Sequence, residues 1–209
     1  MHTPQGMNYW DYIRVEDLLS KSSLPHCLPA PTAPDKLTGG RDGTGLELTA
    51  EDFVGRDHGM ENRTGIQTLA YEDEVGLLLC PDAMIFYERE SPQAARVSVQ
   101  RIHESMIDLC ELAKDRFAIL DLPKVRDLEE VKQARRARDS DYVAYYYPWL
   151  QVSPPGEKVV LVPPSGHVAG VYARCELRDG VHKAPANEVI QGATQLSLAL
   201  ADDHIGQLN

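Results

Sequence analysis

The sequence predicts an α/β fold with a largely parallel central sheet flanked by helices. Short apolar runs at residues 75–80, 117–120 and 142–149 alternate with segments of helical periodicity. Strand, helix, strand, helix, strand is the order of a βαβαβ unit, which builds parallel strands. The chain has 209 residues, of which 43% are hydrophobic and 25% charged, so it can bury the core that such a sheet needs.

The first strand and the first long helix are expected between residues 75 and 113. Residues 75–80 form a continuous apolar run that ends at Pro81, as in a strand buried on both faces. Ser91 followed by Pro92 is typical of a helix N-cap with proline in the first helical position. The apolar residues that follow at steps of three and four are Val99, Ile102, Met106, Leu109 and Ala113. This spacing predicts a long amphipathic helix.

The second half of the unit repeats this arrangement. After the apolar strand at residues 117–120, Asp127 with Glu130 three residues later resembles a capping box. A second helix is therefore expected to begin there. Residues 142–149 are rich in aromatic side chains and predict a third strand, which Pro148 stops.

Further elements are expected after the unit. Residues 158–162 predict a short strand, and alternating leucines predict another at residues 195–200. A helix of small residues is expected between them. Gly166, Ala169 and Gly170 are predicted to let this helix lie close to the sheet.

The first 45 residues are predicted to form an N-terminal segment that is separate from an α/β core domain at residues 46–209. Residues 11–19 have near-helical spacing of apolar and charged side chains and predict one short helix. Residues 22–42 carry repeated prolines and then glycines, which predict an extended arm.

Charge and cysteine usage exclude several classes of function. The 32 acidic residues outnumber the 21 basic ones, and a net charge of -11 repels nucleic acid and anionic membranes, so neither is an expected partner. No apolar run reaches the ~20 residues that span a bilayer. The four cysteines form no CxxC pair and the histidines lack ligand spacing. We therefore expect no metal site and no disulfide, as in a protein of the reducing cytoplasm.

Two aspartates are expected at the carboxyl ends of strands, where α/β proteins place their catalytic groups. Asp82 and Asp121 follow the first and second predicted strands. A catalytic carboxylate is geometrically possible there, but capping of the helix or turn that follows is the commoner use of such an aspartate. A glycine-rich stretch at residues 39–45 lacks the lysine of a phosphate-binding loop, and no cofactor is expected.

Residues 164–170 read Pro-Ser-Gly-His-Val-Ala-Gly and are similar to the histidine signature of subtilisin-like proteases. Pro164 stands where those proteases have the catalytic histidine, and His167 matches a second histidine that is not catalytic. The serine motif of the proteases is absent from the chain. Since the triad would lack both base and nucleophile, no catalytic residue is assigned and no enzymatic activity is expected.

A basic face is expected late in the second helix. Its members are Lys132, Arg135, Arg136 and Arg138. One interpretation is a solvated helix face whose cations interact favourably with the helix C-terminus. The other is a subunit interface that docks on an acidic patch such as residues 72–74 of another copy. The sequence leaves both open.

Two blocks near the C-terminus carry a family resemblance. Residues 163–174 read Pro-Pro-Ser-Gly-His-Val-Ala-Gly-Val-Tyr-Ala-Arg, and residues 180–187 read Gly-Val-His-Lys-Ala-Pro-Ala-Asn. Together with shorter matches from residue 38 onward, they resemble the contractile tail sheath proteins of bacteriophages and related injection systems. The motif residues to which the resemblance gives a structural role are Pro163, Pro164, Ser165, Gly166, His167, Ala169, Gly170, Lys183, Pro185 and Asn187.

The resemblance implies a structural protein with a subtilisin-like, non-catalytic sheath domain. Such subunits assemble in the bacterial cytoplasm into hexameric rings that stack helically around an inner tube protein. The sheath of the virion or injection system then contracts and drives the tube through a target envelope. The alternatives to this function are a subtilisin-fold serine hydrolase and a nucleotide-binding α/β domain.

Sheath proteins usually continue beyond a Leu-Asn pair like residues 208–209 into a further domain. The resemblance therefore implies that the chain is truncated before the family's C-terminal domain. Terminal strands link neighbouring subunits in this family. On its own, this chain is expected to stay a monomer or weak oligomer.

Overall fold

The computed structural model describes residues 48–59, 62–135, 138–156 and 158–200, together with residues 204, 206 and 208. The chain divides into Met1–Thr44 and Gly45–Asn209, and every described residue belongs to the second unit. The predicted helix at residues 11–19, the arm at residues 22–42 and the glycine-rich stretch all lie outside the described residues.

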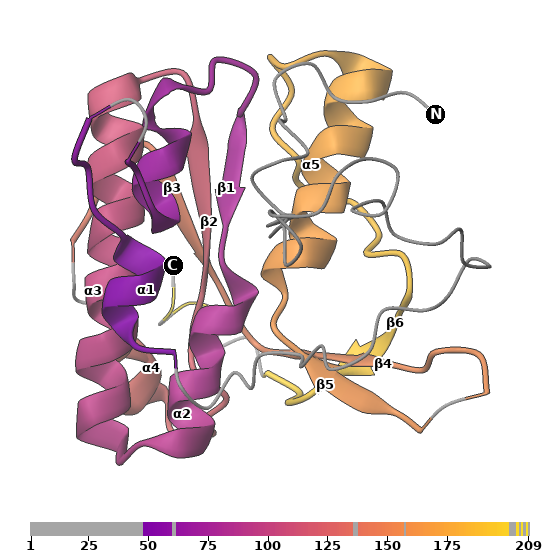
Figure 1. Ribbon diagram of the computed structural model, residues 1–209. Helices are drawn as coiled ribbons and strands as arrows, with labels where there is room; N and C mark the ends of the chain where they lie inside the picture. The colour runs from indigo at the N-terminus through magenta and orange to yellow at the C-terminus, as the bar shows by residue number, and fades with distance from the viewer. Residues whose placement is uncertain are drawn as a thin grey trace, which may run out of the picture. The chain divides into compact units, whose positions relative to one another are not determined.

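The main sheet contains three parallel strands in the order β1-β2-β3 (Figure 1). Their bounds are Leu77–Leu79 for β1, Phe117–Asp121 for β2 and Val143–Tyr146 for β3. Helix α3 (Pro92–Ala113) connects β1 to β2, and α4 (Leu128–Arg135) connects β2 to β3. The predicted βαβαβ unit is confirmed. Because β2 is central, its last four residues are all buried.

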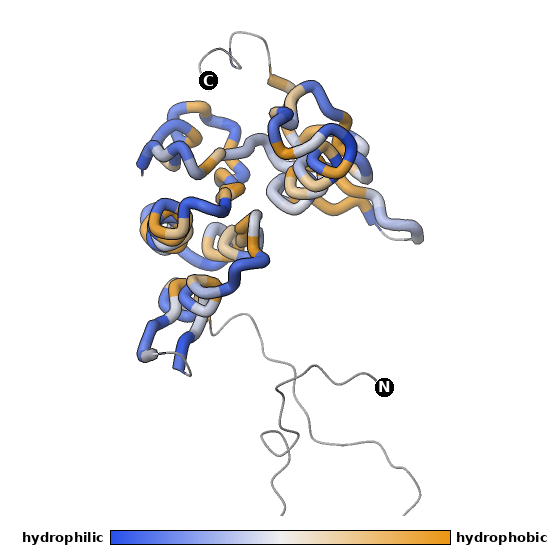
Figure 2. The backbone as a smooth tube through the Cα atoms, turned by 90° about the horizontal axis from the view of Figure 1, so that it is seen from above, coloured by the Kyte–Doolittle hydropathy of each residue, from blue (hydrophilic) through white to orange (hydrophobic). Residues whose placement is uncertain are grey.

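Helix α3 begins where its local sequence predicts. The Ser91 hydroxyl accepts a hydrogen bond from the backbone N–H of Ala94 at 3.4 Å, and Pro92 is the first helical residue. The buried residues of α3 are Ala95, Val99, Ile102, His103, Met106, Ile107, Leu109 and Cys110. Figure 2 shows that the helices have polar and apolar residues on different sides. Burial of the apolar side supplies the main stabilisation of this helix.

Four short elements precede or follow β1 and cover the rest of the core. They are α1 (Ala50–Val54), η3 (Gly65–Tyr71), η4 (Pro81–Ile85) and α2 (Phe86–Arg89). The Phe53 and Phe86 rings meet edge to face, with centroids 5.7 Å apart. Gly55 has a φ of +72°, and a Cβ there would lie 1.7 Å from the Thr64 carbonyl oxygen, so only glycine fits this close approach.

A second, antiparallel sheet contains β4 (Leu150–Val152) between β5 (Val160–Val162) and β6 (Ala193–Leu196). The expectation of one largely parallel sheet is therefore wrong for this half. The segment expected as one strand at residues 142–149 is interrupted at Pro148, which has no N–H to donate. A short connection then joins β4 to β5, and short connections produce antiparallel pairs.

Helix α5 (Ser165–Asp179) packs against β1 and β2, on the opposite side of the parallel sheet from α3 (Figure 1). Its buried residues are Ser165, Val168, Val171 and Cys175. Gly166 and Gly170 are exposed, and no described atom lies within 4 Å of a Cβ built on either. The predicted close packing through these glycines is wrong, because at 100° per residue the buried positions turn 166 and 170 outward. Ala169 is half-buried.

Candidate functional site

The start of α5 is tied to the end of β2 by a buried hydrogen bond. The backbone N–H of Ser165 donates to Oδ1 of Asp121 at 2.8 Å, and the two residues are 0% and 2% exposed. A carboxylate is favourable at a helix N-terminus because the first N–H groups lack partners inside the helix. Burial raises the pKa of Asp121 to about 6, although the hydrogen bond from the Ser165 backbone acts in the opposite direction.

This contact gives Asp121 a capping role, although the helix that it caps is not the one that follows it in the chain. The structure places its carboxylate as the cap of α5, a helix that begins 44 residues later in the chain. Asp82 lies exposed in the first turn of η4, so the two aspartates have different environments. The Ser165 hydroxyl is buried and has no hydrogen-bond partner among the described residues, so it is not paired with a histidine there.

The first family-motif block runs from the start of α5 through most of its length, and the second block begins where the helix ends. Pro163, Pro164 and Ser165 stand at the start of α5, and Gly180 with a φ of +91° ends it. Arg174, the last residue of the first block, donates to the Val189 carbonyl at 2.6 Å, just beyond the second block. The two blocks are therefore joined through the C-terminal half of α5.

Within the first block, the His167 ring lies beside Gly192, with Nε2 3.6 Å from a Cβ built there. In the second block, Lys183 contributes to a charge cluster, Pro185 is half-buried, and Asn187 is exposed with a φ of 60°.

A network of ion pairs holds the second block against the end of α5. Arg178 contacts Asp179 at 2.6 Å and Glu188 at 2.5 Å, and Lys183 contacts the same carboxylates at 2.9 and 3.3 Å. The hydrogen bond from Arg178 holds the pKa of Asp179 well below its usual range and lowers that of Glu188 to about 2. The network fixes the loop after α5 to the helix.

Cys175, Asp179 and Glu188 place one ligand-type atom each within 4.8 Å of one another, the only such group in the part of the chain that the structure describes. Both carboxylates are already paired with Arg178 and Lys183. A metal ion would have to displace these cations or lie beside them. We assign the group to the ion-pair network and not to a metal centre.

The predicted basic cluster is distributed between α4 and the following segment, and its described members are ion-paired within the chain. Lys132 contacts Glu129 at 2.8 Å and Arg135 contacts Asp139 at 3.5 Å. Arg138 contacts Glu111 and, at 2.5 Å, Asp108, both on α3. Arg136 lies outside the described residues. These pairs reduce the positive charge that the cluster presents to a partner.

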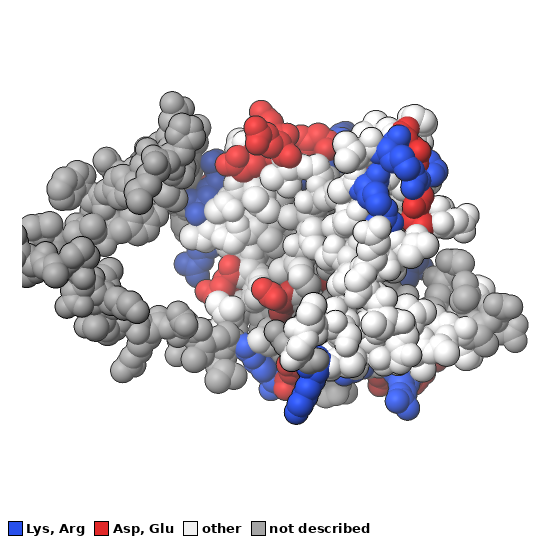
Figure 3. All heavy atoms as spheres, turned by 90° about the vertical axis from the view of Figure 1, so that its right-hand side faces the viewer, with Lys and Arg blue, Asp and Glu red and all other residues white. Residues whose placement is uncertain are grey.

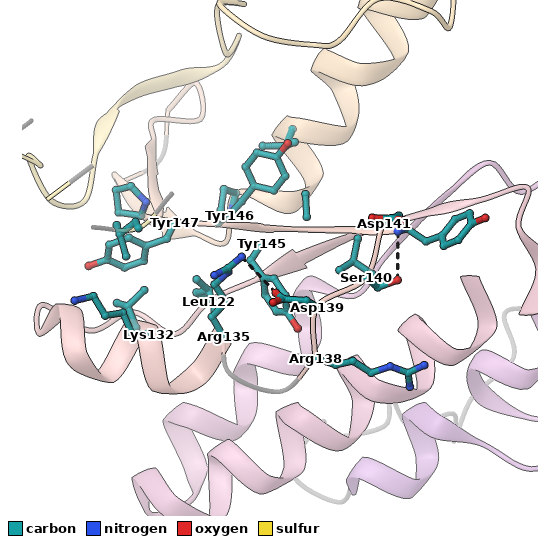
Figure 4. A pocket seen from close by; sticks show the side chains of 18 of the residues that line it. Leu122, Lys132, Arg135, Arg138, Asp139, Ser140, Asp141, Tyr145, Tyr146 and Tyr147 are labelled. Atoms are coloured by element: carbon teal, nitrogen blue, oxygen red, sulfur yellow. Dashed lines mark hydrogen bonds and ion pairs between the residues drawn. The ribbon is translucent and has the colours of Figure 1, made fainter. Parts of the chain in front are cut away.

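A groove of about 1660 Å³ runs along β3, the outer strand of the parallel sheet (Figure 4). Val143, Ile190 and Leu196 contribute accessible apolar surface to it, and the basic cluster contributes charged groups. Three consecutive tyrosines also line the groove. The Tyr147 hydroxyl donates to the Val125 carbonyl at 2.5 Å, whereas the Tyr145 hydroxyl is buried without a described partner.

The centre of the face that carries α5 and the second sheet is mostly uncharged, and acidic and basic side chains lie around its edges (Figure 3). Glu72, Asp73 and Glu74, the acidic patch named from the sequence, are all exposed. In the described residues no helix combines the length and the apolar character needed to cross a membrane. The described cysteines, Cys80, Cys110 and Cys175, are free thiols.

Comparisons with known proteins identify the class to which this fold belongs. Residues 91–209, more than half of the chain, match the family model described as the phage tail sheath protein central domain. This is a class of structural proteins of contractile tails. The chain belongs to the phage tail sheath family.

The chain is also similar to parts of several solved structures. The contracted baseplate of the anti-feeding prophage shares 25% identity with a TM-score of 0.53, over 64% of this chain and 35% of that one. The contracted helical sheath of the same particle shares 26% identity with a TM-score of 0.49, over 69% and 36%. The contracted PVC sheath of an extracellular contractile injection system shares 32% identity with a TM-score of 0.44, over 51% and 30%.

The chain thus spans about a third of the length of these sheath structures. A comparison with curated protein sequences finds no match.

Proposed function

We propose that this chain is the core of a structural subunit that assembles with other copies around an inner tube and contracts to drive the tube through a target envelope. The match of residues 91–209 to the sheath central domain is the observation that carries this proposal. The similarity to the contracted baseplate of the anti-feeding prophage supports it. Hexameric rings, the tube partner, assembly in the host cytoplasm and the subtilisin-like character of the domain are parts of the same proposal.

The role is structural and not catalytic. Pro164 stands at the position of the protease base, and Ser165, the nearest hydroxyl, is 0% exposed and therefore inaccessible to a substrate. Nucleotide binding is disfavoured because β1 leads into the turn η4 (Pro81–Ile85), which has no glycine-rich phosphate loop. The acidic net charge of -11 disfavours a nucleic-acid partner.

The surfaces proposed to contact neighbouring subunits are the groove along β3 and the basic cluster beside it. Lys132, Arg135 and Arg138 would have to exchange their internal carboxylate partners for those of a neighbour such as residues 72–74. Such an exchange between exposed pairs contributes little free energy. The groove, with its apolar and tyrosine lining, is better suited to supply the buried contact area.

Labelling of native particles tests the function. Contractile particles would be purified from cells that make this chain and decorated with gold-conjugated antibody raised against it. We expect label along the outer surface of extended and contracted tails. Label confined to another part of the particle, or particles without the chain in their mass spectra, would overturn the proposal.

A further inference from the structure

A small cavity lies where α2, α3 and α4 meet the carboxyl end of β2. Within this cavity, the volume that the centre of a water molecule can occupy is about 10 Å³. His103 of α3 and Asp121 of β2 both line this space, and they are 4% and 2% exposed. A space of this size holds a single water molecule, provided that polar groups are present to bind it.

Both residues have hydrogen-bonding capacity that the described chain does not use. Asp121 accepts from Ser165 through Oδ1, but its Oδ2 is buried without a hydrogen-bond partner. The His103 ring makes an edge-to-face contact with Tyr145, centroids 6.0 Å apart, and has no hydrogen bond to any described residue. Buried polar groups in native proteins are almost always paired with protein or with ordered water.

We propose that this cavity binds one structural water molecule that bridges the imidazole of His103 and Oδ2 of Asp121. Water suits the pair because it donates two hydrogen bonds and accepts two. One O–H donates to the carboxylate oxygen, and the oxygen or the second O–H bonds the ring nitrogen that faces the cavity. A metal ion is disfavoured, because Arg96 also lines the cavity and would repel it.

The protonation states of the two residues are consistent with this bridge. Burial lowers the pKa of His103 to about 4 and raises that of Asp121 to about 6. At neutral pH the ring is uncharged and the carboxylate is ionised, so one N–H, one lone pair and the carboxylate are all available to water.

The other ionisable groups around the pair come from several elements. Tyr87 on α2 and Arg96 on α3 line the same cavity, Cys80 precedes η4 and interacts with the charge of Asp121, and Tyr145 on β3 contacts the His103 ring. Burial raises the pKa of Tyr87, Cys80 and Tyr145, so these three are neutral at pH 7. The charged groups that act on these neighbours are Arg96 and Glu130 beside Tyr87, Asp82 beside Cys80, and Arg135, Asp139 and Glu104 beside Tyr145.

The bridge joins the two helical layers of the domain. His103 belongs to α3 on one side of the parallel sheet, and Asp121 caps α5 on the other side. With the water in place, a continuous chain of hydrogen bonds runs from His103 through Asp121 to Ser165. This inference concerns the interior of one subunit and goes beyond the proposed role in the sheath.

High-resolution crystallography of the full chain tests the proposal. At about 1.5 Å or better we expect one density peak within hydrogen-bond distance of both the His103 ring and Oδ2 of Asp121. In His103→Leu the peak should be lost while the Ser165–Asp121 bond remains. An empty cavity, direct contact between His103 and Asp121, a bound cation, or a peak that keeps full occupancy in His103→Leu would each overturn it.

Nuclear magnetic resonance supplies an independent measurement in solution. A bridging water exchanges slowly with bulk solvent, so we expect cross-relaxation between the water signal and the His103 ring protons, and protons near them, in the wild type. In His103→Leu, which has no ring, the cross-relaxation to those neighbouring protons should disappear. Gln93→Ala, an exposed change on the same helix, is the matched control and should keep the signal. Absence of the cross-relaxation in the wild type contradicts the bridge.

Discussion

The backbone N–H of Ser165 donates to the Asp121 carboxylate at 2.8 Å, although the two residues are 44 positions apart in the chain. The contact joins the last residue of β2 to the first residue of α5. It satisfies one of the N–H groups that every helix leaves unpaired at its start. The histidine-containing motif of the family is therefore anchored in the sheet at its first helical residue.

The role of this cap can be measured by comparing two variants. Asp121→Ala leaves the buried N–H of Ser165 without an acceptor, and we expect a loss of about 1–3 kcal/mol in the free energy of unfolding. Asp121→Asn keeps an acceptor oxygen and removes a charge that is costly to bury, so its stability at pH 7 should equal or exceed that of the wild type. Urea unfolding decides this, and equal destabilisation of both variants would contradict the capping role.

The pH dependence of stability should reveal two opposing groups. Asp121 has a folded pKa of about 6, above the 3.8 that is usual for an aspartate, so its contribution to stability increases as the pH falls from 6 towards 4. His103 has a folded pKa of about 4, below the 6.5 that is usual for a histidine, so its contribution to stability is lost over the same range. Each effect amounts to about 3 kcal/mol, and in the wild type they oppose one another.

Single variants should therefore separate the contributions of the two residues to the change of the free energy of unfolding with pH. Relative to the wild type, Asp121→Asn is expected to lose stability on acidification from pH 6.5 to 4, and His103→Leu is expected to gain it. Urea unfolding at half-unit pH steps measures both differences. Parallel profiles for all three proteins would show that neither group is perturbed by burial.

The outward face of α5 should tolerate larger side chains in the isolated chain. Gly170 is exposed and open around its Cβ position, so Gly170→Ala is expected to stabilise the helix by about 0.5–1 kcal/mol. Val168→Ala, on the buried face, should cost about 1.5 kcal/mol or more. Thermal unfolding measures both. A Gly170→Ala variant that folds normally but fails to enter particles would place this face at a subunit contact.

The ion-pair network after α5 should hold its loop without governing global stability. Glu188→Gln weakens the contacts to Arg178 and Lys183, so amides at residues 180–192 are expected to exchange faster with an unchanged melting temperature. Glu176→Gln, an exposed change on the same helix, is the control. Hydrogen exchange read by mass spectrometry reports both, and unchanged loop exchange in Glu188→Gln would argue against the anchoring role.

Absence of hydrolase chemistry is also testable. Because Ser165 is fully buried and Pro164 cannot act as a base, a fluorophosphonate probe for serine hydrolases should not label the chain. Subtilisin serves as the positive control. Labelling of the wild type that Ser165→Ala abolishes would contradict the structural assignment.

The local sequence by itself determined the elements whose signals lie within a few residues. Ser91 and Pro92 set the start of α3, and the apolar spacing behind them determined which side of that helix is buried. The order of strands and helices determined the parallel β1-β2-β3 sheet, because a helical crossover between strands returns the chain in the same direction. The two motif blocks also identified the family from the sequence, because each block is a continuous stretch of the chain.

Only the tertiary structure decided which distant groups meet. It paired Asp121 with Ser165, brought Arg138 to Asp108 on α3, and placed His103 and Asp121 around one cavity. It also turned Gly166 and Gly170 outward and made the second sheet antiparallel. Periodicity and capping are local properties of the backbone, whereas these contacts depend on how whole layers pack. Segments far apart in the chain acquire their partners only when the core that joins them has formed.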